Sequence, residues 1–264
     1  MGIRAEAYPG DVERVAQQVV ASIGRAEERG DPFHHLRLAD VFPADVYAAM
    51  MRSMPGAEGY RPMSGRARES RAPDGSPTRT KLDLFPEFVR HLPPDSRSVW
   101  GTVGRALCDA QVREAFRGRF AGALEKRFGA AHGSAGLYPI PILTRDVAGY
   151  RIGIHPDTRR KAITVQLYLP ADRSVEHIGT VFHRRGGDGG YERASKMPFA
   201  PNTGYAFAVG SDTYHSVDTV GPEVRTRDSI LLTYFADQTW IEVVRNRAKR
   251  LGNLVLNELR ALAR

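Results

Sequence analysis

The second half of the chain consists of short β-type runs, and this feature limits the fold more than any other. From Leu137 onward, apolar and β-branched residues come in short runs, and Gly and Pro separate one run from the next. Such runs between turn residues are typical of short strands in an all-β unit. We predict strands near residues 137–144, 149–155, 162–169, 178–183, 204–209, 214–220 and 228–235. The sequence therefore predicts a mainly β core in residues 136–238.

The first half shows helical periodicity instead. Asp11 is a good N-cap, and Val12, Val15, Val19 and Ile23 then recur at helical spacing up to Gly24. A second helix is expected from about Pro43 to Met54, after an extended piece at residues 31–36. Apolar stripes between Pro94 and Gly129 predict further helices that cover one face of the sheet. Residues 1–135 are thus expected to be mostly helical support for the β core.

Two other segments bear on the organisation of this single expected domain, residues 1–264. Residues 55–78 are rich in Gly, Pro and Arg and read as a long irregular loop, which is either an active-site lid or a plain surface insertion. Residues 239–264 carry apolar side chains at helical spacing, which predicts an amphipathic C-terminal helix. That helix either caps the core or pairs with a second copy of the chain to form a homodimer.

The amino-acid composition limits which cellular compartment and which partners are expected for the protein. The chain has 264 residues, of which 42% are hydrophobic, so it can bury a large core as one domain. Its one cysteine, Cys108, excludes an internal disulfide framework and favours the cytoplasm. The net charge of +8 suggests nucleic acid as a possible partner. However, the arginines are scattered and the sequence contains no recognisable nucleic-acid-binding module, so we expect no nucleic-acid partner. No apolar run approaches membrane-spanning length, and no membrane partner is expected.

The sequence His155-Pro156-Asp157 carries the chemistry. In a strand, residues two apart share a face, so His155 and Asp157 can reach one ion together. The best third ligand is His215, which follows the apolar run Tyr205–Val209. Two histidines and one carboxylate leave coordination positions open, which is the signature of non-haem Fe(II) oxygenases and unlike a closed structural zinc site.

Together with Arg227 and Ser229, these residues resemble the Fe(II)/2-oxoglutarate-dependent dioxygenase superfamily. The ordered set His155-x-Asp157, His215 and Arg227-x-Ser229 covers about a third of the chain. The resemblance implies a double-stranded β-helix, the jelly-roll or cupin-like barrel, flanked by N-terminal and C-terminal helices. It also implies Fe(II), 2-oxoglutarate as cosubstrate and O2. In the family the arginine binds the far carboxylate of 2-oxoglutarate, for which its planar fork is suited, and the serine assists.

Further residues are candidates for the same site or rivals for it. Within Ile163–Leu169, the polar residues Thr164, Gln166 and Tyr168 alternate with apolar ones, so they should line the cavity and contact 2-oxoglutarate or substrate. His183 is a rival third ligand with its own Arg193-x-Ser195, but that pair, in a polar segment after the glycines, lacks a strand to hold it. Arg225 is a rival anchor that lacks a serine two residues on.

The resemblance implies an oxygenase that acts on a small polar metabolite. The reaction would be hydroxylation or a related oxidation of a C–H bond, such as ring closure. Bacterial natural-product biosynthesis, such as that of antibiotics, is the expected setting. One alternative is an oxygenase that acts on a protein or nucleic acid, which would need an open approach to the iron. A further alternative is a jelly-roll protein that is non-catalytic or independent of 2-oxoglutarate. The complete set of site residues makes that alternative the weakest.

Overall fold

The fold was analysed in a computed structural model that describes residues 9–63, 71–129, 133, 135–237, 247, 248, 250–252, 254, 255 and 258. Two antiparallel sheets form its centre. The larger sheet has eight strands in the order β1-β2-β10-β7-β12-β5-β4-β3, and the smaller has four in the order β6-β11-β8-β9. Strands that are neighbours in the sheets are distant in the sequence, as expected for a jelly-roll barrel.

The large sheet is built from strands of both halves of the chain. Its strands are β1 (Glu27–Arg29), β2 (His35–Leu38), β3 (Arg61–Pro62), β4 (Arg79–Asp83), β5 (Gly136–Asp146), β7 (Lys161–Tyr168), β10 (Thr203–Ala208) and β12 (Arg227–Asp237). The small sheet contains β6 (Ile152–His155), β8 (Thr180–Arg185), β9 (Tyr191–Lys196) and β11 (Tyr214–Val217).

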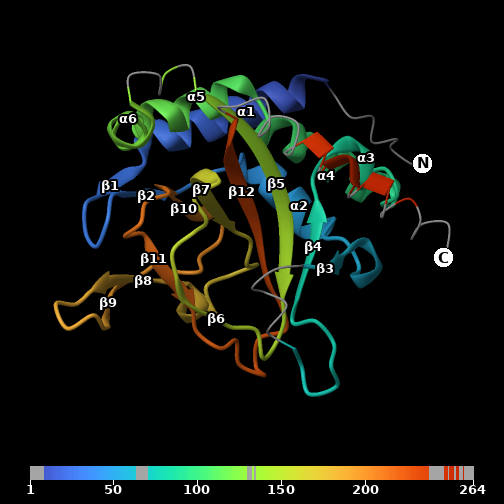
Figure 1. The fold of residues 1–264 in the computed structure, drawn as a ribbon. Coiled ribbons are helices and arrows are strands. Elements are labelled where there is room, and N and C mark those ends of the chain that lie inside the picture. The colour runs from blue at the N-terminus through green and yellow to red at the C-terminus, as the bar shows by residue number, and fades with distance from the viewer. Residues whose placement is uncertain are drawn as a thin grey trace.

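Most of the helices cover the outer face of the large sheet. They are α1 (Pro9–Arg25), α2 (Ala44–Arg52), α3 (Pro86–Val89), α4 (Pro94–Leu107), α5 (Ala110–Arg119) and α6 (Ala121–Phe128). Figure 1 shows α1, α4, α5 and α6 grouped on one side of the molecule, with the small sheet on the other. Apolar helix residues such as Val19 and Trp100 pack in one core with Val165 of β7 and Leu232 of β12. This burial removes the apolar face of each layer from water and fixes the helices on the sheet.

A second core lies inside the barrel, between the two sheets. It contains Tyr168 of β7, Phe182 of β8 and Phe207 of β10, together with Tyr150 and Phe199. Ile163, Val165 and Leu167 of β7 pack in the core under the helices, whereas Tyr168 packs in this inner core. The alternation in β7 thus separates its two faces as the sequence predicts, and Thr164, Gln166 and Tyr168 face the barrel interior.

The fold class is confirmed: a mainly β jelly roll with supporting helices. The expected strands are all present, with ends that differ by a few residues. The strand β9 was not expected, because Tyr191–Lys196 is a polar run and carries no apolar alternation. It contains Arg193 and Ser195, so the expectation that this pair lacks a strand was wrong. The strand β4, Arg79–Asp83, was not expected either.

The structure describes only part of residues 55–78 and 239–264, the two segments whose role the sequence leaves open. Within residues 55–78 the structure has a 3-10 turn at Ala57–Gly59 and the strand β3, which pairs with β4. The segment is therefore less irregular than expected. Residues 64–70 lie outside the described residues. Most of the expected C-terminal helix also lies outside them. In its described part, Arg250 pairs with Glu87, and Glu258 pairs with Arg90 and His91, beside α3. Among the described helices, none is long and apolar enough to cross a membrane.

Candidate metal centre

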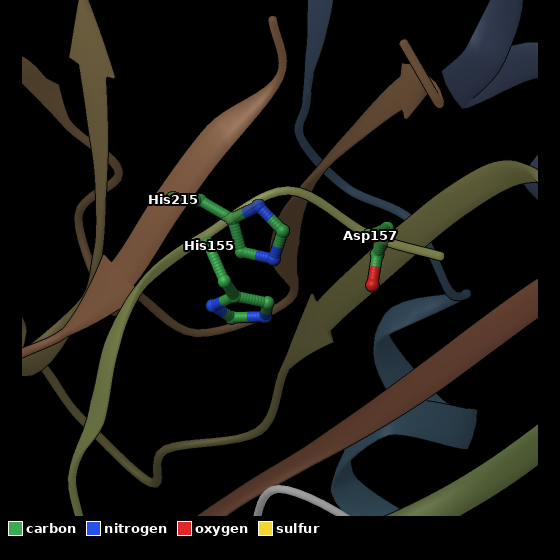
Figure 2. A group of neighbouring side chains, drawn as sticks. All are labelled: His155, Asp157 and His215. Carbon is green, nitrogen blue, oxygen red and sulfur yellow. The ribbon is translucent and has the colours of Figure 1, made fainter. Parts of the chain in front are cut away.

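His155, Asp157 and His215 come together where β6 and β11 pair. His155 is the last residue of β6 and lies directly opposite His215 in the antiparallel register. The centroids of the two imidazole rings are 4.4 Å apart. Candidate ligand atoms of His155, Asp157 and His215 all lie within 4.8 Å of one another. Figure 2 shows the two rings side by side, with the Asp157 carboxylate across from them.

Backbone hydrogen bonds orient both imidazole rings for metal binding. Nδ1 of His155 lies 2.8 Å from the carbonyl oxygen of Gly153, and Nδ1 of His215 lies 3.1 Å from that of Thr213. In each ring, Nδ1 therefore carries the proton and donates it to the carbonyl, which leaves the lone pair of Nε2 for a metal ion. The carbonyls lie two residues before each histidine, so the local backbone sets the tautomer.

The protonation states suit a divalent ion. Burial lowers the pKa of His215 to about 4, although the nearby Asp157 carboxylate opposes this effect, so the ring is neutral at neutral pH. Burial alone would raise the pKa of Asp157, but the charge of Lys161 and hydrogen bonds from Lys161 and Thr164 hold this pKa below its usual range. The neutral imidazole of His215 and the ionised carboxylate of Asp157 are donors of the kind that Fe(II) takes in oxygenases with open coordination positions.

Two neighbours hold the carboxylate of Asp157. Nζ of Lys161 donates to Oδ1 at 2.6 Å, and Oγ1 of Thr164 donates to Oδ2 at 2.6 Å. The Asp157 side chain is 7% exposed. Thr164, expected to contact 2-oxoglutarate or substrate, thus lies beside the metal centre and bonds one of its ligands. Lys161 was not expected there.

The rival residues lie elsewhere. His183 is directly opposite Tyr214 in the register of β8 and β11, whereas His215 is opposite Phe182, so His183 and His215 point to opposite faces of the small sheet. Nε2 of His183 lies 2.7 Å from Oγ of Ser216, on the outer face. Arg225 is exposed, whereas Arg227 is buried.

Gln166, Ser229 and Tyr168 make hydrogen bonds inside the barrel. Nε2 of Gln166 donates to Oγ of Ser229 at 2.6 Å, and Oγ of Ser229 also lies 2.9 Å from Oγ1 of Thr144. The Tyr168 hydroxyl donates to Oγ1 of Thr180 at 3.0 Å. These polar groups line the inner face of the large sheet between the metal centre and Arg227.

Arg227 belongs to a buried group that we call the deep cationic cluster: Arg79, Asp146 and Arg227. Arg227 is 1% exposed, and its Nη1 donates to Oδ2 of Asp146 at 2.9 Å while its Nε donates to the carbonyl oxygen of Ile178 at 2.9 Å. Arg79 donates two hydrogen bonds to the same carboxylate, from Nε to Oδ1 at 2.5 Å and from Nη2 to Oδ2 at 2.7 Å. The cluster therefore combines two guanidinium groups with one carboxylate at the inner end of the barrel.

Sequence reasoning missed Arg79, Asp146 and Lys161. For Arg79 a signal exists: Arg79, Lys81 and Asp83 alternate with Thr80, Leu82 and Leu84, which is the period of a strand with one polar face. Lys161 has no such signal. The register between β12 and β7 shifts between Tyr234 and Phe235, so Lys161 lies opposite Phe235, and such a bulge redirects a side chain.

Comparison with solved structures finds the same fold. The structure of a prolyl 4-hydroxylase from Phytophthora capsici matches with a TM-score of 0.54 and 11% identity, over 90% of this chain and 70% of that one. A prolyl-4-hydroxylase from Pseudomonas putida matches with a TM-score of 0.48 and 16% identity, over 84% of this chain and 98% of that one. A 2OG-Fe(II) oxygenase family oxidoreductase from Burkholderia pseudomallei matches with 0.47 and 15%, over 89% and 95%.

The likeness to the Phytophthora capsici structure lies in the fold, because the identity is low. No protein-family model and no curated protein matches the sequence. The chain shares the jelly-roll fold of the prolyl 4-hydroxylase structure from Phytophthora capsici, and its sequence motifs predict this fold.

Proposed function

We propose that the protein is an Fe(II)- and 2-oxoglutarate-dependent oxygenase that oxidises a C–H bond of a small polar metabolite. One observation carries the proposal: His155, Asp157 and His215 present three ligand atoms within 4.8 Å, with both imidazoles in the metal-binding tautomer. When bound, the iron supplies O2 activation, coupled to decarboxylation of 2-oxoglutarate to succinate. The fold, shared with solved oxygenases, supports the proposal.

In this proposal His155, Asp157 and His215 hold the iron, and Thr164 and Lys161 keep the Asp157 carboxylate in place. Both hydrogen bonds to Asp157 measure 2.6 Å, so the ligand is fixed before the ion binds. The polar group of Thr164, Gln166, Tyr168 and Ser229 contacts 2-oxoglutarate. Its position on the inner face of the large sheet supports this role.

Arg227 binds the far carboxylate of 2-oxoglutarate. Two arginines share the single carboxylate of Asp146 in the deep cationic cluster, which leaves one unit of positive charge among its three residues. The hydroxyl of Tyr150 is buried without a hydrogen-bond partner in the described part of the chain, and the guanidinium of Arg79 stacks over its ring at 4.1 Å. A buried hydroxyl without a partner costs free energy, and a carboxylate of the cosubstrate would satisfy it.

The experiment that tests the reaction class needs no substrate. Anaerobic protein mixed with Fe(II) and 2-oxoglutarate is expected to develop a weak visible charge-transfer band that neither component gives alone. Admission of O2 is then expected to produce succinate slowly. A protein that binds iron but yields neither band nor succinate would contradict the proposal and favour the 2-oxoglutarate-independent alternative.

The variant His215→Ala tests the ligand set, with His183→Ala as its control. His215→Ala removes a ligand but little core volume, so we expect a folded protein by circular dichroism that no longer retains Fe(II). His183→Ala lies on the opposite face of the same sheet and is expected to retain it. The reverse result would reassign the third ligand.

The setting and the assembly are also proposed. We propose a role in bacterial natural-product biosynthesis in the cytoplasm, and the single cysteine supports a reducing compartment. We further propose a homodimer through the C-terminal helix, supported by the exposure of Leu251 and Val255. Sedimentation of the wild type and of a Leu251→Lys variant tests it: only the wild type is expected to dimerise.

A further inference from the structure

A small cavity opens on the inner face of the large sheet, between β4, β5 and β12. It has a volume of about 140 Å³. Aromatic and aliphatic side chains form most of its wall, among them Phe85, Phe88, Leu231 and Phe235. Pockets for drug-sized ligands measure roughly 300–1,000 Å³, so this one accepts a small molecule.

The cavity lies next to the metal centre. Lys161 lines it, and Nζ of Lys161 is 2.6 Å from Oδ1 of Asp157. Thr233 also lines it and lies directly opposite Thr164, whose hydroxyl donates to the other oxygen of Asp157. Lys161 therefore connects the cavity wall to Asp157, and Thr233 places the wall one strand away from Thr164, so the cavity adjoins the candidate metal centre.

The charged residues of the wall favour an anion. Among the lining residues, Lys81, Lys161 and Arg250 are cations and Asp83 is an anion. Nζ of Lys81 donates to Oδ1 of Asp83 at 3.1 Å, and Arg61 also contacts the Asp83 carboxylate. We call Arg61, Lys81 and Asp83 the cavity cationic cluster. Lys81 is 7% exposed, and an ammonium group in such an enclosed place attracts a carboxylate more strongly than one in water.

We infer that this cavity binds the primary substrate, and that the substrate is a small molecule with an apolar body and a carboxylate that pairs with Lys81. The inference rests on the proposed function, because the cavity is a substrate site only if the neighbouring metal centre is catalytic. The apolar walls bury the body of the molecule, and the ammonium of Lys81 orients it. A carboxylate is the smallest common organic anion and leaves most of the volume to that body.

The inference is tested with benzoate and two neutral or cationic analogues of nearly the same shape, benzamide and benzylamine. Each is titrated into the full-length, metal-free protein, and binding is followed by ligand-observed NMR. We expect benzoate to bind at least about tenfold more tightly than benzamide, which corresponds to ~1.4 kcal/mol. Benzylamine is expected to show no binding.

Lys81→Met is the deciding variant, and Lys196→Met is its matched control. Lys196 is a lysine on β9, paired with Asp218 at 3.1 Å and remote from the cavity wall. Lys81→Met is expected to weaken benzoate about tenfold and to leave benzamide unchanged. Lys196→Met is expected to change neither. Equal binding of benzoate and benzamide, or an unchanged benzoate affinity in Lys81→Met, would overturn the inference.

A competition experiment separates this site from that of the cosubstrate. With Zn(II) in place of iron and saturating 2-oxoglutarate, benzoate is expected to stay bound, because the two carboxylates use different ends of the barrel. Displacement of benzoate would mean that the cavity holds 2-oxoglutarate itself and would overturn the assignment to the substrate. The titrations use metal-free protein, so benzoate binding can be measured whether or not the candidate metal centre binds iron. A failure of iron binding, which would contradict the proposed function, is therefore distinguishable from a failure of the cavity to bind benzoate.

Discussion

The deep and the cavity cationic clusters lie on the same inner face of the large sheet, and each places two cations on one aspartate. The strand β4 contributes to both clusters, with Arg79 in the deep cluster and Lys81 and Asp83 in the cavity cluster. These residues occupy every second position of the strand and therefore share one face. In the deep cluster Asp146 is 0% exposed, and the guanidinium of Arg227 lies 5.2 Å from the ring centroid of Phe199. In the cavity cluster, Lys81 and Asp83 line an opening beside the metal centre. Both aspartates are buried, with side chains 0% and 4% exposed, and the clusters differ in that Lys81 and Asp83 border a cavity.

The difference between the clusters shows what surroundings do to a charge. Arg79 uses two nitrogens on the two oxygens of Asp146, a geometry that the planar guanidinium provides and an ammonium does not. The deep cluster therefore holds Asp146 in a fixed position, and one unit of positive charge remains for the far carboxylate of 2-oxoglutarate. The cavity cluster uses Lys81, a point charge on a flexible stem, which can turn from Asp83 to an entering carboxylate.

The largest expected difference concerns stability. Asp146→Asn leaves two arginines in the barrel without their carboxylate, and loss of one partner of a buried ion pair costs about 3–5 kcal/mol. We expect the free energy of unfolding in urea to fall by that amount. Asp83→Asn is expected to lose less than half as much, because water in the cavity can solvate the remaining cations. Equal losses would mean that the two clusters do not differ in the way described.

The next effect concerns the affinity for 2-oxoglutarate. Arg227→Leu removes the cationic partner of the far carboxylate, which costs about 2–5 kcal/mol, so the apparent affinity should fall about 30-fold or more. Isothermal titration of protein loaded with a divalent metal measures it, after circular dichroism has shown that the variant is folded. Arg225→Leu, at an exposed position, is expected to have little effect. A larger loss in Lys81→Met than in Arg227→Leu would exchange the roles of the two clusters.

A smaller effect, of opposite sign, is expected when Asp83 is neutralised. Asp83→Asn removes the anion that competes for Lys81, so benzoate should bind about fivefold more tightly, or by ~1 kcal/mol. The NMR titration measures this gain, and benzamide serves as the neutral control. Weaker binding of benzoate would indicate that Asp83 holds Lys81 in its binding position and does not compete with the ligand.

The smallest expected effect is that of salt. Raising NaCl from 0.1 to 1 M shortens the Debye length from about 10 to about 3 Å, so benzoate affinity should fall about two- to threefold. The difference in unfolding free energy between wild type and Asp146→Asn should stay the same, because the buried ion pair of Arg227 and Asp146 is screened little by salt. A salt-dependent difference would show that ions reach the deep cluster.

The metal centre could be predicted from the sequence because its geometry is largely local. His155 and Asp157 stand two residues apart at the end of a strand, and the carbonyls that orient His155 and His215 come from two residues before each ring. The choice of His215 over His183 needed the register of β8 and β11, which places the two histidines on opposite faces. From the sequence, only the poor strand pattern around Arg193 and Ser195 argued against His183.

By itself, the sequence determined the fold class, the polar inner face of β7 and the grouping of His155, Asp157 and His215. These follow from periodicity and short spacings, which depend on the backbone geometry of a single strand. The tertiary structure decided which charges meet: it brings Arg79, Asp146 and Arg227 together from three strands, and a shift of register places Lys161 on Asp157. Ion pairs between distant strands depend on strand order and register. These are set by the packing of the whole barrel, and no local pattern encodes them.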